Sequence, residues 1–92
     1  MTLALRVPPE AAAELLGAAE RYETELASLG ADFLTEIRTT EQHILDWPDA
    51  SPVFPGWEEL PVVRRASVRV FPYRVLYYRT TAAAPLLAAP AS

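Results

Sequence analysis

The sequence of 92 residues contains no cysteine and no lysine. Without cysteine there are no disulfides, no thiol nucleophiles and no zinc sites built from thiolates, and this composition agrees with a cytosolic protein. Because lysine is absent, the positive charge rests on arginines, whose guanidinium groups stay ionised and form planar, bidentate or stacked contacts. An alanine-rich, lysine-free composition is equally expected of a GC-rich genome, so it does not by itself assign a function.

Long apolar runs are missing as well. No run approaches the roughly 20 residues that a helix needs to cross a bilayer, so we expect no transmembrane helix and no membrane partner. Residues 1–6 lack the basic region and the apolar stretch of a signal peptide, which predicts a cytoplasmic protein. With 51% hydrophobic and 22% charged residues, the chain has a globular composition, and its length suits one domain, which we place at residues 1–80.

The charges are divided between the two ends of the chain. Residues 1–59 carry all 12 acidic side chains and three arginines, a balance of −9, whereas residues 60–92 carry five arginines and no acid, a balance of +5. The cationic segment is interleaved with tyrosines, so it is a candidate surface for anionic or planar partners. The acidic remainder would repel a bare polyanion, and we therefore do not expect direct nucleic-acid binding.

Apolar spacing predicts a short strand followed by a helix. Residues 2–7 alternate at the period of a half-buried strand, which the two prolines that follow bring to an end. The helix has apolar residues at intervals of three and four, and it should stop at residues 28–30, where Gly30 can take the left-handed conformation. The apolar stripe of this helix consists of Leu15, Ala19, Tyr22, Leu26 and Leu29.

A second helix follows at once and should pack antiparallel against the first. It ends at residues 47–48, and its apolar side is marked by Phe33 or Leu34, Ile37, Ile44 and Leu45. His43, the only histidine, falls on the polar side of this helix. Because no second histidine or suitably spaced ligand set accompanies it, we expect no metal site, no cofactor and no catalytic residue.

Residues 47–61 contain four prolines and three large aromatic side chains, so they form a stiff loop. We expect Trp47, Phe54 and Trp57 to pin this loop to the domain, and a recognition surface is the alternative. Residues 65–70 and 73–80 then predict two antiparallel strands, with a corner at residues 71–72. Residues 81–92 are rich in alanine and proline and should form a tail or an edge strand, because proline cannot donate to a sheet ladder.

The order of these elements, together with the run FPYRVLYYR at residues 71–79, resembles the RelE/ParE superfamily of type II toxins, also known as plasmid stabilisation proteins. The resemblance covers residues 2–80, and residues 12–22, 29–34 and 71–74 are similar to the ParE branch. It implies an α+β fold with an N-terminal strand, an antiparallel helix hairpin and a small, mainly antiparallel sheet. It also implies a hetero-oligomer with a cognate antitoxin, expected to be of the ribbon-helix-helix type, whose flexible end wraps the hairpin and the sheet and suppresses growth inhibition.

Members of this superfamily differ in their targets. ParE-like members are described as poisoning DNA gyrase, whereas RelE-like members cut messenger RNA in the ribosome. RNA cleavage needs basic groups around the scissile phosphate and a group that moves a proton, and an always-protonated arginine is a poor base. We therefore predict a ParE-like toxin that binds a protein target of the DNA gyrase class. The alternatives are an inactive protein that only binds its antitoxin and a RelE-like ribosome-dependent mRNA endonuclease.

The resemblance also suggests two surfaces. The target-binding candidates are Arg64, Arg65, Arg69, Tyr73, Arg74, Tyr77, Tyr78 and Arg79, and the antitoxin-binding candidates are Leu15, Leu16, Tyr22, Phe33 and Ile37. As the alternative, the tyrosines pack in the core and the arginines pair with carboxylates of the acidic helices in the same molecule. Family members usually continue into a polar end, whereas residues 82–92 carry no charge, so we expect an atypical or truncated C-terminus.

Overall fold

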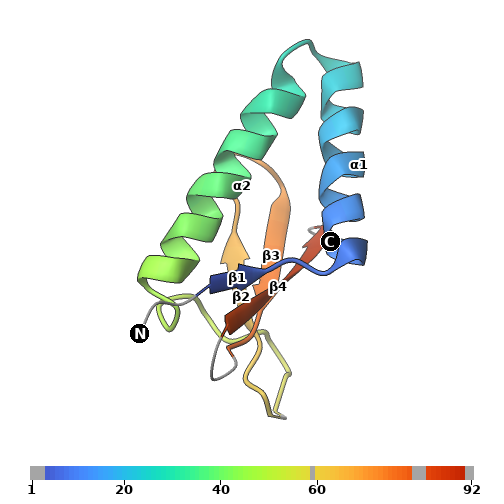
Figure 1. Cartoon of the computed structure of the whole chain (residues 1–92). Helices are drawn as coiled ribbons and strands as arrows, with labels where there is room; N and C mark the ends of the chain where they lie inside the picture. The colour runs from blue at the N-terminus through green and yellow to red at the C-terminus, as the bar shows by residue number, and fades with distance from the viewer. Residues whose placement is uncertain (1–3, 59, 80–82, 91–92) are drawn as a thin grey trace.

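The computed structural model describes residues 4–58, 60–79 and 83–90. It contains the elements β1 (Ala4–Arg6), α1 (Pro9–Glu25), α2 (Leu29–Asp46), β2 (Arg64–Ser67), β3 (Tyr73–Tyr77) and β4 (Ala83–Pro90). The two helices form a hairpin that stands on one sheet of four strands (Figure 1). The α+β class expected from the sequence is confirmed, while residues 2–3 of the predicted first strand lie outside the described residues. Neither α1 nor α2 is long and apolar enough to cross a membrane.

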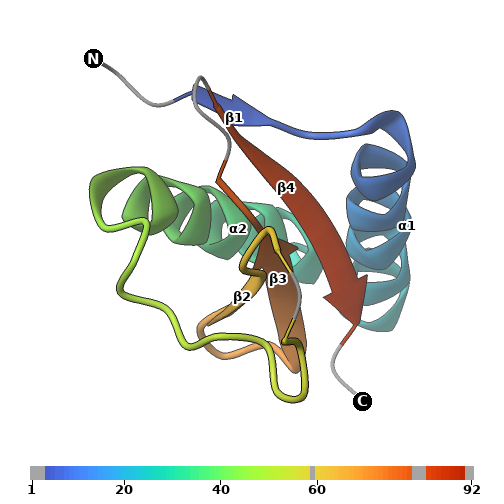
Figure 2. The same cartoon turned by 90° about the horizontal axis from the view of Figure 1, so that it is seen from below.

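The strand order is β1-β4-β3-β2, with β1 parallel to β4 and the other two pairs antiparallel (Figure 2). Where the sequence predicts a tail or an edge strand for residues 81–92, β4 pairs with β1 through residues 83–85 and with β3 through residues 86–90. Its two prolines explain how this is tolerated. Pro85 ends the ladder with β1 and precedes the ladder with β3, and Pro90 ends the ladder with β3. At the end of a ladder, the missing N–H of proline costs little.

Helix α1 begins with proline in its first turn, where the missing N–H has no partner within the helix. Its buried residues are Ala11, Leu15, Ala18 and Ala19, which recur at the spacing of one helix face. The predicted stripe extends too far, since Leu26 is 63% exposed. The reason is that α1 ends at Glu25 and Leu26 already has an extended backbone.

The turn between the helices differs from the prediction at Gly30. The left-handed residue is Ser28, with φ of 75°, while Gly30 lies in the first turn of α2 and is buried. A Cβ on Gly30 would lie 2.5 Å from the carbonyl oxygen of Ala19, so glycine is needed here for close packing of the two helices. The Glu23 carboxylate accepts hydrogen bonds from the backbone N–H groups of Ser28 and Gly30, at 2.8 and 3.0 Å. It thereby satisfies backbone N–H donors at the start of α2, and its negative charge interacts favourably with the positive end of the helix dipole.

The core lies between the hairpin and one face of the sheet. Helix α2 contributes Phe33, Ile37 and Ile44, and alternate residues of β3 contribute aromatic and aliphatic side chains. Four rings join α1, α2 and the strands, with centroids of neighbouring rings 4.9–5.2 Å apart, and they belong to Tyr22, Phe33, Phe71 and Tyr73. Since such contacts stabilise beyond the area they bury, this cluster fixes the hairpin on the sheet.

The loop between α2 and β2 is only partly held by its aromatic side chains. The ring nitrogen of Trp57 donates a 2.9 Å hydrogen bond to the carbonyl oxygen of Pro61, and Phe54 is half-buried. Trp47, however, is 65% exposed, so the prediction that it pins the loop is wrong. Trp47 is the C-terminal cap residue of α2, directly after the last helical residue, where its backbone is no longer helical.

Candidate functional site

Part of the arginine and tyrosine segment lies on the face of the sheet that points away from the helices. Strand side chains alternate between the two faces, and in β3 the alternate residues from Tyr73 to Tyr77 are buried against the hairpin. Arg74, Leu76 and Tyr78 therefore point to the other face and are half-buried. Arg65 lies directly across from Leu76 in β2. This set, which we call the open-face strip (Arg65, Arg74, Leu76, Tyr78), combines two guanidinium groups with apolar and aromatic surface.

Two of the predicted target-binding tyrosines belong to the core instead. Tyr73 and Tyr77 are almost completely buried, which places them among the packing residues of the alternative hypothesis. The Tyr77 hydroxyl donates to the carbonyl oxygen of Pro48. The buried Tyr73 hydroxyl has no hydrogen-bond partner among the described residues. Burial raises the pKa of Tyr73, Glu14 raises it further, and Arg21 lowers it. Because both side chains are buried in the core, they present almost no surface to a protein partner.

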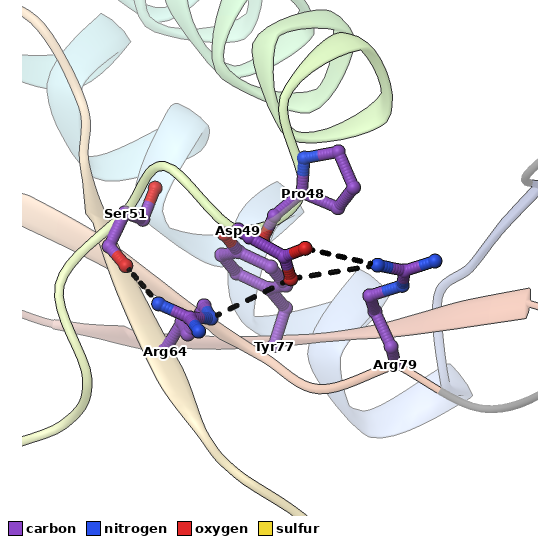
Figure 3. Close-up of polar contacts among 6 residues, drawn as sticks. All are labelled: Pro48, Asp49, Ser51, Arg64, Tyr77 and Arg79. Carbon is purple, nitrogen blue, oxygen red and sulfur yellow. Dashed lines mark hydrogen bonds and ion pairs between the residues drawn. The ribbon is translucent and has the colours of Figure 1, made fainter.

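Arg64 and Arg79 pair with a carboxylate of the same molecule (Figure 3). Nη1 of Arg79 lies 3.2 and 3.4 Å from the two oxygens of Asp49, and Nε of Arg64 lies 4.0 Å from Oδ1 of the same side chain. Arg64 also donates a 2.8 Å hydrogen bond from Nη1 to the carbonyl oxygen of Ser51. For these two arginines, the pairing is intramolecular, as in the alternative, but the carboxylate belongs to the loop after α2 and not to either acidic helix. Sequence reasoning missed Asp49, because its partners follow 15 and 30 positions later in the chain.

A second group of arginines lies beside the only histidine. A hollow of about 420 Å³ opens between α2 and β2, and its lining includes Glu36, His43, Arg65 and Arg69. His43 is exposed on α2, as the helical spacing predicts. It lies beside the arginines because β2 runs alongside this side of α2. The hollow therefore combines two permanent cations with one carboxylate and one imidazole.

The predicted antitoxin-binding residues divide into a groove and the core. A mainly apolar groove of about 340 Å³ runs between α1 and α2 and is lined by Val7, Ala12, Leu15, Leu16, Leu34, Ile37, Arg38 and Glu41. Among the predicted antitoxin-binding residues that line the groove, Leu16 is the most exposed, at 57%. Tyr22 and Phe33 are absent from this lining and belong to the aromatic cluster of the core. Burial raises the pKa of Glu41, while Arg38 lowers it, so the groove desolvates a carboxylate even without a ligand.

The described residues contain no group of three or more histidine, aspartate or glutamate side chains that could hold a metal ion. The chemistry of the surface is thus carried by guanidinium groups, hydroxyls, one imidazole and isolated carboxylates. Guanidinium groups can bind anionic and planar partners, and an apolar groove can accommodate a protein segment.

Comparison with known proteins adds one structural relative. The fold is similar to that of a solved chain described as "Chromosomal ParDE TA system from P. aeruginosa", with a TM-score of 0.81 over 99% of this chain and 98% of that chain. The two sequences are 15% identical. No family model matches the sequence, and no curated protein matches it significantly. The chain therefore has the fold of a component of a ParDE toxin–antitoxin system, in agreement with the ParE-like fold expected from its sequence.

Proposed function

We propose that this protein is the toxin component of a type II toxin–antitoxin system. It acts as a ParE-like inhibitor that binds a cytoplasmic protein target of the DNA gyrase class, and a cognate antitoxin neutralises it. The observation that carries this proposal is the likeness of nearly the whole chain to a chain of a ParDE system. The match extends from β1 to β4, so it includes both surfaces that the sequence nominated.

The apolar groove between α1 and α2 is the proposed antitoxin site. Leu16 offers exposed apolar surface in this groove, beside the buried side chains of Leu15 and Ile37, and a flexible segment can order on such a surface. Nine of the 12 acidic side chains belong to α1 and α2, and one of them, Glu41, lines the groove. An antitoxin segment with apolar anchors and flanking basic residues therefore complements it, and a ribbon-helix-helix domain elsewhere in the antitoxin would supply DNA binding.

The open-face strip is the proposed target site. It presents Arg65, Arg74 and Tyr78, which are residue types enriched at protein interfaces because they combine planar surface with hydrogen bonding. The net charge of −4 and the acidic hairpin oppose association with free nucleic acid. A folded protein target with local acidic and aromatic groups fits this surface better.

Induced expression in a bacterial host tests the proposal. Gyrase poisoning predicts filamentous growth and induction of a DNA-damage reporter, and the purified protein should inhibit gyrase supercoiling in vitro. Co-expression of a cognate antitoxin gene, to be sought beside this reading frame, should restore growth. An inactive protein that only binds its antitoxin would produce none of the toxic effects yet still co-purify with that gene product.

The hollow at His43 favours messenger-RNA cleavage as a second candidate function. There, Arg65 and Arg69 are able to stabilise phosphate charge, and His43 is able to move a proton. This candidate predicts a prompt loss of translation on induction, with ribosome-dependent cleavage of messenger RNA. Replacing His43 with glutamine should abolish that cleavage, whereas inhibition of gyrase should be unaffected.

A further inference from the structure

A small hollow of about 200 Å³ lies where β3 ends, β2 begins and the loop after α2 crosses them. It is lined by Asp49, Val62, Arg64, Tyr77, Tyr78 and Arg79. This hollow is separate from the apolar groove on the hairpin and from the hollow that contains His43. Figure 3 shows the two guanidinium groups on either side of the Asp49 carboxylate. The hollow thus has two fixed positive charges against one negative charge.

Asp49 does not use the full binding capacity of the two arginines. Arg79 contacts both carboxylate oxygens through the single atom Nη1, at 3.2 and 3.4 Å, and not through the two parallel hydrogen bonds of a bidentate pair. The Arg64 contact of 4.0 Å is too long for a hydrogen bond. Each guanidinium group has five N–H donors, so several remain for a better placed acceptor.

Displacing Asp49 from this arrangement costs little. The Asp49 side chain is 68% exposed and that of Arg79 is 46% exposed, and ion pairs with such exposure contribute little to stability. The backbone beside Asp49 is fixed independently, because the Tyr77 hydroxyl holds the carbonyl oxygen of Pro48 and Arg64 holds that of Ser51. The carboxylate can therefore swing away while the loop keeps its place.

We propose that this hollow binds a carboxylate side chain from an acidic segment of a protein partner, and that Asp49 is the internal substitute for that carboxylate. Two arginines that converge on one oxyanion favour a bidentate contact. Val62 is exposed and Tyr78 is half-buried at the rim, so they provide apolar contacts for residues next to the acid. The expected ligand is therefore a segment with one or two carboxylates next to apolar residues. A nucleic-acid strand is disfavoured, because the acidic half of the chain would repel its phosphates. The inference does not depend on the toxin proposal.

Binding of a short peptide to the full chain tests this site. The probe is a five-residue peptide that alternates leucine and glutamate, followed through the arginine Nε–Hε signals in NMR spectra and by titration calorimetry. We expect the signals of Arg64 and Arg79 to shift, and the D49N variant to bind about fivefold more tightly, because the competing carboxylate is lost. R79Q should weaken binding about tenfold, since a charge-assisted bidentate contact is removed.

Matched controls separate this site from general electrostatic attraction. Arg69 is exposed and lines the hollow at His43, but it does not line the hollow that contains Asp49. R69Q should therefore change the peptide affinity less than twofold, as expected for a screened charge outside the site. A peptide with glutamine in place of glutamate should not bind. The proposal is overturned by equal losses in R69Q and R79Q, by an unchanged affinity of D49N, or by a single-stranded oligonucleotide that binds more tightly than the peptide. Among the described residues, the Arg79 side chain forms hydrogen bonds and an ion pair only with Asp49, so R79Q should keep its fold. Circular dichroism of the variant checks this.

Discussion

The hydroxyl of Tyr77 donates a 2.7 Å hydrogen bond to the carbonyl oxygen of Pro48, 29 positions earlier in the chain. This bond ties the end of β3 to the loop that leaves α2. The same short loop carries Asp49 and Ser51, which contact Arg79 and Arg64. A buried tyrosine that sequence reasoning assigned to target binding therefore organises the polar cluster from inside the core.

The two buried tyrosines of β3 provide a matched pair of variants. We expect Y77F to lower the free energy of unfolding by about 1 kcal/mol, because it leaves the Pro48 carbonyl oxygen without its partner. Y73F should be neutral or slightly stabilising, because it removes a buried hydroxyl that has no partner among the described residues. Urea denaturation followed by circular dichroism measures both. Equal destabilisation of the two variants would contradict the assignment.

Two glycines should respond in opposite ways to alanine. In G30A the new Cβ would meet the Ala19 carbonyl oxygen at 2.5 Å, so the helices must separate, and we expect a loss of about 2 kcal/mol. In G17A the nearest atom would be the flexible Arg21 guanidinium at 3.5 Å, an ordinary contact. Since Gly17 lies inside α1, alanine should stabilise the protein by up to about 1 kcal/mol. Thermal unfolding of both variants measures this, and a stable G30A would show that the hairpin is less closely packed.

Local patterns predicted the helices well, and long-range pairing decided the features they missed. The spacing of Leu15 and Ala19, or of Phe33 and Ile37, depends only on helical geometry, so it could be taken from the sequence. The place of β4 could not, because it depends on pairing between Arg6 and Pro85 at opposite ends of the chain. Proline suggested an edge strand, and nothing local shows that each proline falls at the end of a ladder.

The candidate site was predictable to a similar degree. Strand alternation separates Tyr73 and Tyr77 from Arg74 and Tyr78, but only the placement of the helices decides which face is covered. The partnership of Asp49 with Arg79 and the approach of β2 to His43 both depend on tertiary packing. Residue type and period therefore nominate surfaces, and the placement of the hairpin determines which of them remain open.

Glu41 should make stability depend on pH. Burial raises its pKa above the ordinary value of 4.5, and Arg38 opposes this shift. Because the folded state then binds the proton more tightly than the unfolded chain, the contribution of Glu41 to stability falls as pH rises from 4.5 through its folded-state pKa. The uncharged E41Q variant lacks this loss. We expect its stability relative to the parent protein to be greatest near pH 7 and to decline as the pH falls toward 4.5.

Urea denaturation of both proteins between pH 4 and pH 7 measures that difference. The R38Q variant is a useful companion, because removal of the guanidinium group takes away the influence that lowers the pKa of Glu41. The loss of stability between pH 4.5 and neutral pH that Glu41 causes should therefore be larger in R38Q than in the parent protein. A difference between E41Q and the parent that grows on acidification would contradict the assigned direction.

Leu16 and Leu26 test the proposed antitoxin groove without disturbing the core. Their side chains are 57% and 63% exposed, but only Leu16 lines the groove. We expect L16E to weaken antitoxin binding at least about tenfold, because it places a charge in an apolar contact beside the acidic hairpin. L26E should bind as the parent protein does, and both should unfold at similar urea concentrations. Co-purification with the adjacent gene product, followed by calorimetry, distinguishes them, and equal binding by the two variants would place the antitoxin elsewhere.

The open-face strip should separate toxicity from neutralisation. Arg65 and Arg74 make no ion pair among the described residues, so the double variant R65Q/R74Q should fold normally. We expect it to lose at least about tenfold in gyrase inhibition and to retain antitoxin affinity, because interface arginines contribute strongly to binding while the groove is unchanged. R21Q, on the exposed surface of α1, is the matched control and should stay toxic.

Since Arg65 also lines the hollow at His43, H43Q completes the comparison. Loss of toxicity in both R65Q/R74Q and H43Q, with intact gyrase activity, would favour messenger-RNA cleavage, whereas loss in R65Q/R74Q alone supports recognition of a protein target.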